Sequence, residues 1–595
     1  MSSQKLILLR ELFDQFGLDG YLVPKANKHQ CEYLRSDEER LQWLTNFSGS
    51  AGSVIVLKNK AALFVDGRYI LQAHHEVDKS LFDIIDTTYT SALNWLMNHV
   101  SSGTKTGVDP WLITRHTFKA YQKLLREREA SLLSVGQNLI DCLWQNKPTQ
   151  PVHKAVIHPL EVSGLSHSEK IENLTEKIRE KGADGTLITM VESVNWLFNI
   201  RGHDLDYMPV VFSFAFVHKD GRATLFMDLE KVTDELRRHL GEKVMIQPYQ
   251  AILSFLGELG HHKPIILVDP VLSPLKLITI LEETGSRVLY ADDLTLLPKA
   301  CKNPVEIRGM RETHLRDGAA LTMFLHWVIK ESLNQKVTEI EAVQKLHEFR
   351  ARFPTFWGDS FPTISAVSAH GAIVHYRVTP STDCLLEADG LYLVDSGAHY
   401  HDGSTDVTRT IVLGKPTPEQ KDRFTRVLKG HIALAQLIFP QGTTGGQIDA
   451  FARSFLWQAG LDYAHGTGHG VGSVMNIHEG PQRISKAANT IPLQPGMVVS
   501  NEPGYYRAEH YGIRLENLVV VVSVDIAGAE HPMLGFETLT LAPIDVRLID
   551  HTLITSSETK WLNEYHQYVH DALAPLIEGV EAKKWFYDVT QPLCL

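Results

Sequence analysis

The spacing of apolar residues alternates between a helical and a strand-like period in the first part of the chain. Residues 1–17 carry apolar side chains at helical spacing among charged ones, which predicts an amphipathic helix and interrupts any signal-peptide core. Short apolar runs at 53–57 and 61–65 predict buried strands, and the pattern at 114–128 predicts a further helix. This alternation is typical of an α/β domain, and a cleaved secretion signal is not expected.

The first 300 residues contain an internal repeat. Landmark sequences recur in the same order at a nearly constant offset: 17–23 at 182–188, 43–49 at 196–202, and 108–110 at 268–270. Such a repeat indicates two related α/β domains in tandem. Pro148 and Pro151 punctuate a polar stretch between the two copies. We therefore predict an N-terminal domain at residues 1–148 and a second domain at residues 149–302.

The remaining region, 303–595, begins with the helix-start pattern Asn-Pro-Val-Glu at 303–306. A long helix to about residue 332 is expected after it. From residue 362 onward, short strand-like runs alternate with Asp-Gly and Pro-Gly turn signals. The pattern at 559–579 predicts a terminal helix. This region is therefore predicted to be a third domain of mixed α+β structure.

The composition of the 595 residues limits the classes of partner. Its 70 acidic and 58 basic residues give a net charge of −12, which disfavours nucleic acid as a partner. Apolar runs such as 210–217 are too short to cross a bilayer as helices, so no membrane partner is predicted. Five cysteines without a CxxC pair predict neither a disulfide framework nor a cysteine zinc site, and a cytoplasmic location is expected.

Two aspartates flank a predicted turn in the third domain. Asp395 ends the apolar run 391–394, and Asp406 begins the alternating run 406–412. The turn signal Asp402-Gly403 lies between them, so a hairpin would bring both carboxylates together on adjacent strands. Two close carboxylates repel each other unless a cation lies between them. Taken alone, the pair is equally consistent with solvated surface aspartates on a hairpin.

Residues 465–472 have the sequence His-Gly-Thr-Gly-His-Gly-Val-Gly. So many glycines exclude a helix that presents two histidines, and the segment must be a strand or a loop. It lets the backbone approach a crowded site while offering the imidazoles of His465 and His469, and His478 follows nine residues after the second. A phosphate-binding glycine loop is the competing interpretation, but no Gly-Lys-Ser/Thr sequence follows.

Two glutamates accompany apolar runs further along the chain. Glu502 comes just after the run 497–500, and Glu516 lies inside the near-continuous apolar run 512–521, which predicts a central strand. A glutamate there is costly unless it is paired or bound to metal. Each alone would more often be a surface or salt-bridged group. Together with both aspartates and His469 they form an oxygen-rich set suited to two divalent cations such as manganese.

Several of these segments carry a resemblance to a known superfamily. The segments are 393–398, 402–410, 465–472, 501–504 and 514–517. They resemble the metal-binding motifs of pita-bread-fold peptidases, with all five ligand positions filled. From about Gly17 to the C-terminus, the chain resembles the aminopeptidase P family of the long, three-domain cytosolic type. The loop 365–370 departs from the family pattern, which usually contains more glycine and asparagine there.

The resemblance implies a fold, an activity and a set of site residues. The fold would be α/β and α+β: two related creatinase-like α/β domains followed by a pita-bread catalytic domain. The activity would be metal-dependent hydrolysis that releases the N-terminal residue from peptides with proline at position 2. The ligands of two divalent metal ions, with Mn²⁺ as the first expectation, would be Asp395, Asp406, His469, Glu502 and Glu516. Glu502 would also exchange a proton with the attacking water, and the substrate-binding, proton-transferring histidines would be His375, His465 and His478.

Other functions remain open at this point, and each histidine taken singly would more often be structural. Prolidase shares the five ligands but acts on free Xaa-Pro dipeptides. Methionine aminopeptidase would need only the last domain, and creatinase keeps the architecture without the full metal set. From a different class, pita-bread domains also serve as noncatalytic protein-binding modules, which usually lose ligands. The filled ligand set and the three domains favour aminopeptidase P.

The resemblance also implies a quaternary structure and an entrance to the active site. Glu32 and Arg68 match polar family residues that border this entrance, in the same or a neighbouring subunit, and would help delimit the pocket for the first substrate residue. Long aminopeptidases P usually form homodimers through the catalytic domain. If the terminal helix does not pack internally, its apolar face would be made by Trp561, Leu562, Tyr565 and Tyr568.

Overall fold

The computed structural model describes residues 2–334, 337–386 and 389–594. These residues form two compact units. The N-terminal unit contains residues 1–160 and 165–296, and the C-terminal unit contains residues 161–164 and 297–595. In the described part of the chain, no helix combines the length and the apolar character that a membrane span requires.

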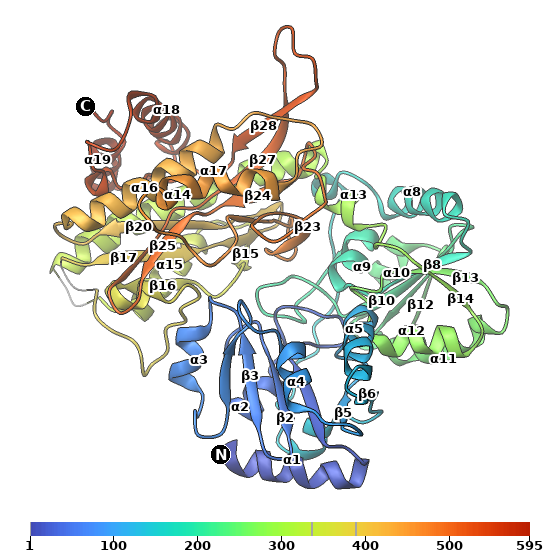
Figure 1. Ribbon diagram of the computed structural model, residues 1–595. Helices are drawn as coiled ribbons and strands as arrows, with labels where there is room; N and C mark the ends of the chain where they lie inside the picture. The colour runs from blue at the N-terminus through green and yellow to red at the C-terminus, as the bar shows by residue number, and fades with distance from the viewer. Residues whose placement is uncertain (1, 335–336, 387–388, 595) are drawn as a thin grey trace. The chain divides into compact units, whose positions relative to one another are not determined.

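The N-terminal unit holds two six-stranded sheets with the same topology (Figure 1). The first has the order β4 (Asp83–Asp86), β3 (Ala61–Val65), β2 (Ser53–Leu57), β1 (Gly20–Pro24), β5 (Lys105–Val108), β6 (Ser131–Ser134). The second has the order β12 (Val244–Pro248), β11 (Ala223–Met227), β10 (Ser213–His218), β8 (Gly185–Ile188), β13 (Ile265–Val268), β14 (Arg287–Tyr290). In both, the fourth strand pairs antiparallel with the third and parallel with the fifth. The shared pattern confirms the tandem repeat predicted from the sequence.

Local signals explain the helices of this unit. The predicted amphipathic helix is α1 (Ser2–Phe16), which buries Leu6, Leu9 and Phe13 on one face. The helix expected at 114–128 is α5 (Arg115–Arg126). Its N-cap is Thr114, whose side chain accepts a hydrogen bond from the backbone of Thr117 and so satisfies one otherwise unpaired N–H group.

The C-terminal unit begins with the 31-residue helix α14 (Pro304–Asn334). Asn303 caps it as the sequence predicts, because its Oδ1 accepts hydrogen bonds from the backbone of Val305 and Glu306. The Glu306 carboxylate in turn accepts from the Asn303 N–H, which completes a capping box. The next helix is α15 (Glu339–Arg350).

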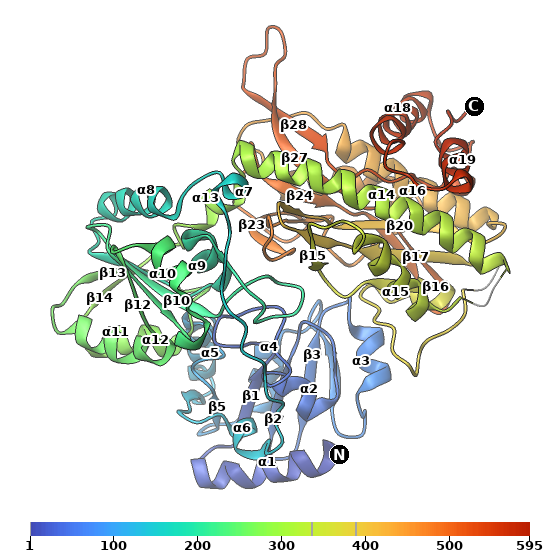
Figure 2. The same cartoon turned by 180° about the vertical axis from the view of Figure 1, so that it is seen from behind.

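Three sheets of the C-terminal unit carry the strands that matter for the site. The first sheet has the order β16 (Ile364–Val367), β17 (Leu391–Ser396), β20 (Val407–Val412). The second pairs β25 (Gly504–Arg507) with β26 (Tyr511–Arg514). The third is six-stranded, in the order β21 (Phe439–Pro440), β28 (Met533–Thr538), β27 (Asn517–Val524), β24 (Val498–Asn501), β22 (Gly468–Gly470), β23 (Glu479–Ile484). Helices α16 (Pro418–Ala435) and α17 (Gly445–Trp457) lie in front of these strands in Figure 1, and α14 lies in front of them in the opposite view of Figure 2. The strands are therefore covered by helices on both faces.

The C-terminal helices α18 (Ser556–Leu573) and α19 (Val580–Val589) lie together beside α14 (Figure 2). The predicted terminal helix is therefore confirmed, but its predicted apolar docking face is wrong. Leu562 and Tyr565 are buried in the core of their own unit, while Tyr568 is exposed. The Tyr565 hydroxyl also accepts a hydrogen bond from Arg409 at 3.0 Å. Periodicity alone could not distinguish packing within the chain from packing against a second copy.

Candidate metal centre

Asp395 and Asp406 lie on paired strands, as the hairpin prediction requires. Strands β17 and β20 pair antiparallel, with Asp395 opposite Thr408, and Asp406 directly precedes β20. Both aspartates are buried. Single carboxylate oxygens of Asp395, Asp406 and Glu516 lie within 4.8 Å of one another. The structure therefore brings the two aspartates together and adds a third carboxylate to them.

The chain reaches the same place from two further segments. His469 lies in β22, and Glu502 follows β24, with its backbone N–H donating to Thr467 at 2.8 Å. One ligand atom each of His469, Glu502 and Glu516 also lies within 4.8 Å of the other two. The His469 Nε2 atom is 3.4 Å from an Asp406 carboxylate oxygen. All five predicted ligands thus converge, and their assignment as ligands remains a prediction.

The single central strand predicted around Glu516 is wrong. The apolar run at 512–521 is divided between β26, which pairs with β25, and β27, which joins the six-stranded sheet. Glu516 lies in the connection between these strands, where its carboxylate accepts a hydrogen bond from the Thr408 hydroxyl at 2.7 Å. Because the chain passes from one sheet to another at this point, Glu516 lies outside both strands and its buried carboxylate can face the two aspartates.

Burial and mutual repulsion make this group of carboxylates unfavourable when all are charged. Burial, and then the charges of Asp406 and Asp395, raise the pKa of Glu516 well above its ordinary value. Burial also raises the pKa of Asp395 and of Glu502. Burial acts to lower the pKa of His469, but the hydrogen bond to Asp406 and the charge of Glu502 outweigh it and raise this pKa to about 9. Cations among these groups would remove the conflict.

Arg514 is a site residue that the sequence reasoning missed. It is buried, and its guanidinium donates to Asp395 Oδ2 and to the Tyr506 hydroxyl, at 2.6 Å in each case. Among the described residues, Asp395 Oδ1 is buried without a hydrogen-bond partner. Arg514 thus holds one carboxylate oxygen and leaves the other for a different partner. Arg514 lies two residues before Glu516 and Tyr506 lies four residues after Glu502, and this closeness in sequence to two predicted ligands is the signal that could have found them.

The donor set fits two divalent cations. Within the part of the chain that the structure describes, it offers four carboxylates and one imidazole, and the buried Oδ1 of Asp395 has no hydrogen-bond partner. Buried acceptors normally have partners, so this oxygen is available to a metal ion. Hard oxygen donors with a single nitrogen suit manganese, magnesium or a similar ion, and they lack the sulfur that softer ions prefer.

Two of the three predicted histidines contact this group. The rings of His478 and His469 are 4.5 Å apart, and a ring nitrogen of His478 lies within 4.8 Å of ligand atoms of His469 and Asp406. The position of His478 is therefore compatible with binding a metal ion and also with the predicted role of a histidine that is not a ligand. His465 is buried, with Nδ1 3.8 Å from a Glu502 oxygen and Nε2 2.8 Å from the Tyr506 hydroxyl.

The third histidine, His375, is half-buried three residues after the short helix η3 (Ser368–Ala372). This helix packs closely on β26, because a Cβ atom added to Gly512 would lie 1.7 Å from the Gly371 carbonyl oxygen. Strand β26 ends at Arg514, which contacts Asp395. The segment of His375 is therefore fastened to a strand of the site, and its contact with substrate remains a prediction.

A buried ion pair supports both aspartate-bearing strands from behind. Arg350 at the end of α15 donates to both carboxylate oxygens of Asp317 in α14, at 2.8 and 3.2 Å. The same guanidinium donates to the Ser396 hydroxyl, next to Asp395. The Asp317 carboxylate accepts from the Thr405 hydroxyl, next to Asp406. One ion pair therefore fixes the backbone beside two of the predicted ligands.

The segment that contains His478 is supported in a similar way. The next residue, Glu479, is buried and accepts hydrogen bonds from the ammonium groups of Lys299 and Lys302. These two charges lower its pKa, although burial, the largest influence, acts to raise it. Such a cluster is stable only because each buried charge has a partner of opposite sign.

Glu32 and Arg68 both belong to the N-terminal unit. The Glu32 carboxylate accepts a hydrogen bond from the Ser50 hydroxyl at 3.2 Å. Arg68 forms a two-pronged ion pair with Asp66, at 2.8 Å for each hydrogen bond, and about a third of each side chain is exposed. Their predicted role at the entrance of an active site remains a prediction.

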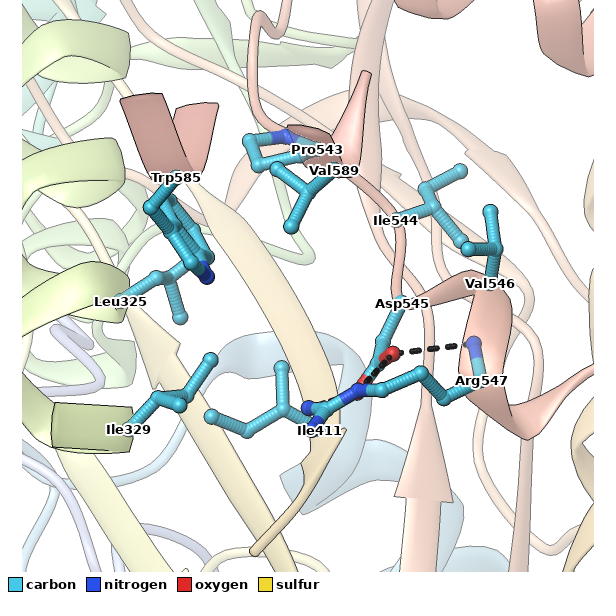
Figure 3. Close-up of a pocket in the computed structure, with 10 residues that line it drawn as sticks. All are labelled: Leu325, Ile329, Ile411, Pro543, Ile544, Asp545, Val546, Arg547, Trp585 and Val589. Carbon is cyan, nitrogen blue, oxygen red and sulfur yellow. Dashed lines mark hydrogen bonds and ion pairs between the residues drawn. The ribbon is translucent and has the colours of Figure 1, made fainter. Parts of the chain in front are cut away.

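The C-terminal unit also contains a cavity whose walls are mainly apolar. Figure 3 shows Trp585 and Val589 of α19 facing Leu325 and Ile329 of α14 across a cavity of about 260 Å³. An ion pair between Asp545 and Arg547 closes one end. None of the predicted site residues is among the side chains that line this cavity. Its walls are suited to apolar packing, and the charged centre described above is the candidate site for chemistry.

Comparison with known protein families gives matches along most of the chain. Metallopeptidase family M24 matches residues 308–523, and the C-terminal region of peptidase M24 matches residues 532–593. The creatinase/prolidase N-terminal domain matches twice, at residues 6–142 and 146–306. The two matches agree with the repeated sheet of the N-terminal unit.

Individual proteins are similar over the whole length. A probable Xaa-Pro aminopeptidase P of Paracoccidioides brasiliensis is 39% identical, with 100% of this chain and 99% of the relative covered. Aminopeptidase P2 of Arabidopsis thaliana is 37% identical, with 99% and 88% covered. The crystal structure of an X-prolyl aminopeptidase from Caenorhabditis elegans, described as a cytosolic enzyme with a di-nuclear active site, matches with a TM-score of 0.96 at 35% identity, covering 100% of both chains. A Xaa-Pro dipeptidase from Bacillus anthracis, at 23% identity and a TM-score of 0.51 over 64% of this chain and 99% of its own, shares the fold alone.

Proposed function

Because this chain belongs to metallopeptidase family M24 and, within it, to the Xaa-Pro aminopeptidase P group, we propose that it is a metal-dependent Xaa-Pro aminopeptidase. Its substrates would be peptides with proline at position 2, from which it releases the first residue. The observation that carries this proposal is the convergence of four carboxylates and one imidazole from separate segments of the chain. The full-length similarity to proteins named for this activity supports the substrate class.

The proposed ligands of the two metal ions are Asp395, Asp406, His469, Glu502 and Glu516, and manganese is the proposed metal. The oxygen-rich donor set supports this choice. Bound divalent cations would supply the chemistry of a metallohydrolase: they lower the pKa of water and polarise a carbonyl group. Arg514 would keep Asp395 oriented so that Oδ1 faces the metal.

The proposed proton carrier is Glu502. The bond before proline is a tertiary amide, so its nitrogen has no hydrogen and must gain a proton as the bond breaks. A carboxylate of Glu502 would accept the proton of the attacking water and deliver one to that nitrogen. His465 lies beside Glu502 and would restrain it, while His478 and His375 are proposed to bind the substrate and stabilise the negative charge on its carbonyl oxygen.

The domain limits are also proposed, at 1–148, 149–302 and 303–595. The family matches that end at 142 and 306 support both boundaries. A cytoplasmic location is supported by the description of the C. elegans structure.

A homodimer formed through the catalytic domain is proposed from the resemblance to the family. The helix face that includes Leu562 and Tyr565 is no longer proposed as part of the dimer interface, because these two side chains are buried within their own unit. Light scattering at micromolar concentration should give twice the chain mass, and a monomer mass would refute the dimer.

Glu32 and Arg68 are proposed to border the pocket of the first substrate residue. Charged side chains at the edge of this pocket could favour the N-terminal end of a peptide and disfavour the binding of its internal peptide bonds. Glu32→Ala and Arg68→Ala should change kcat/KM across peptides that vary at position 1, while both metals stay bound. Asp220→Ala, which removes another exposed Asp–Arg pair of the N-terminal unit, is the control and should leave the profile unchanged. An unchanged profile in both test variants would contradict the proposal.

One assay tests the proposed activity against its alternatives. The protein, reconstituted with metal, is incubated with Xaa-Pro-Yaa peptides, Xaa-Pro dipeptides and Xaa-Ala-Yaa controls, and the released residue is measured. Release of Xaa from Xaa-Pro-Yaa alone supports the proposal. Faster hydrolysis of the dipeptides would identify a prolidase instead. If metal is bound but none of the three substrates is hydrolysed, the chain is a binding protein.

A further inference from the structure

A second group of metal-binding side chains lies where α15 begins. Glu339 is the first residue of this helix, and its side chain is fully buried. Its carboxylate accepts hydrogen bonds from the Val367 N–H at 2.8 Å and from the Tyr376 hydroxyl at 2.9 Å. A buried carboxylate with this many contacts fixes the surrounding backbone, and it is none of the groups assigned above to the metal centre.

Two soft or borderline ligands face the same carboxylate. The Nδ1 atom of His370 is 3.0 Å from each carboxylate oxygen of Glu339 and 3.6 Å from the Cys384 sulfur. Cys384 carries a thiol that is not part of a disulfide. One ligand atom from each of the three residues lies within 4.8 Å of the other two. In a tetrahedral zinc site, bonds of about 2.0–2.3 Å place neighbouring ligands roughly 3.3–3.7 Å apart, and the 3.6 Å between His370 Nδ1 and the Cys384 sulfur lies in this range. The 3.0 Å between His370 Nδ1 and the Glu339 oxygens is a hydrogen-bond distance, so an ion would replace this hydrogen bond and move the two groups a few tenths of an ångström apart.

The backbone holds these ligands in place without a metal. The Glu339 N–H donates to the Cys384 carbonyl at 3.0 Å, and the Leu386 N–H donates to the Val337 carbonyl at 2.8 Å. The His370 ring stacks on the Tyr376 ring, with centroids 4.4 Å apart. His370 and Cys384 are only partly buried, so an ion can reach them from solvent. The three side chains are therefore held in place by the protein at Glu339 and are accessible to solvent at His370 and Cys384.

We propose that Glu339, His370 and Cys384 bind one thiophilic divalent cation, with zinc as the best fit, separately from the metals of the catalytic centre. One thiolate and one carboxylate would neutralise the two charges of the ion. On binding, the thiol releases its proton to solvent, and the proton on His370 Nδ1 moves to Nε2, so that Nδ1 becomes a ligand. The fourth position stays open for water. A sulfur ligand favours zinc or cobalt over the hard cations that suit an oxygen-rich set.

The sequence alone does not reveal this site. His370 ends the loop 365–370, where the chain departs from the family pattern. The sequence predicts no cysteine zinc site, because its five cysteines form no CxxC pair. A glutamate, a histidine and a cysteine at 339, 370 and 384 follow no recognised spacing either. A bound ion would fasten the segment that contains His375 to the start of α15.

Cobalt absorption tests this proposal directly, because a cobalt ion bound to a thiolate gives a sulfur-to-metal charge-transfer band in the near ultraviolet. The catalytic centre as proposed contains no sulfur, so the band reports the new site alone. Manganese-loaded, full-length protein is titrated with Co²⁺. The expected result is a band that saturates at one equivalent per chain and disappears when one equivalent of Zn²⁺ is added.

Variants identify the ligands. Cys384→Ser should abolish the band, and His370→Gln should weaken cobalt binding at least tenfold. Cys301→Ser is the matched control, because Cys301 is another partly buried cysteine of the same unit, and the band should be unchanged. Circular dichroism establishes that each variant is folded. No band in the wild type, or a band that survives in Cys384→Ser, would overturn the proposal. Neither result changes the outcome of the peptidase assay, so the proposed metal site and the proposed peptidase activity can each be refuted without the other.

Discussion

Replacing Arg350 by methionine should destabilise the C-terminal unit and loosen the aspartate-bearing strands. Arg350 is fully buried and donates hydrogen bonds to Asp317, Ser396 and the Gly397 carbonyl. Methionine reproduces the aliphatic part of the arginine side chain but has no guanidinium group, so the Asp317 carboxylate would be left buried without its cation. Breaking a buried ion pair on one side costs about 3–5 kcal/mol of unfolding free energy. At roughly 2 °C per kcal/mol for a unit of this size, the melting temperature should fall by ~6–10 °C.

An exposed pair in the same unit is the matched control. Arg311 also makes two hydrogen bonds to a single carboxylate, that of Glu537, at 2.7 Å each, but half of its side chain is exposed. Arg311→Met should therefore cost no more than ~1 kcal/mol, because water screens and replaces the lost contact. Calorimetric melting of the metal-loaded protein measures both variants, and the difference between them isolates the effect of burial.

A double variant tests whether the unpaired charge causes the loss. Asp317→Asn removes the negative charge and keeps the shape of the side chain: its amide oxygen can accept from one of the Tyr400 and Thr405 hydroxyls, and its NH2 group can donate to the other. Combining it with Arg350→Met should recover roughly 1–3 kcal/mol relative to Arg350→Met alone, since neighbouring residues couple on this scale. The reasoning is refuted if Arg350→Met melts no lower than Arg311→Met, or if the double variant is less stable than Arg350→Met.

The remaining predictions concern the metal centre. Removal of metal by chelation should abolish activity and lower the melting temperature, because the buried carboxylates then repel one another; full activity in protein shown by elemental analysis to be metal-free would refute the two-metal proposal. Glu502→Gln should lower kcat about 10²–10⁴-fold in a peptide-release assay, and wild-type turnover would remove Glu502 from the proton-transfer role. Gly512→Ala should reduce both stability and activity, because the new methyl group would collide with the Gly371 carbonyl; an unchanged melting curve would contradict this close contact. Tyr506→Phe should keep the fold but lower kcat/KM severalfold, because Arg514 and His465 lose a shared partner, and unchanged kinetics would show that this hydroxyl does not help to orient them.

The sequence by itself determined the features that depend on local interactions. The amphipathic helix α1 follows from apolar spacing, and the start of α14 follows from the capping pattern of Asn303 and Glu306. The tandem sheets of the N-terminal unit follow from the internal repeat. The pairing of β17 with β20 follows from two runs separated by a turn signal. Each of these depends on residues that are near one another in the chain, or on motifs whose order is preserved.

Only the tertiary structure decided which distant groups meet. The division of the run 512–521 between two sheets depends on the strands available as partners, and apolar composition does not encode that choice. The contact of Arg514 with Asp395 spans 119 residues. The burial of Tyr565 and the meeting of Glu339 with Cys384 likewise arise when separate elements pack. Charges and thiols carry no periodic signal of their own, so their partners become known only when the chain has folded around them.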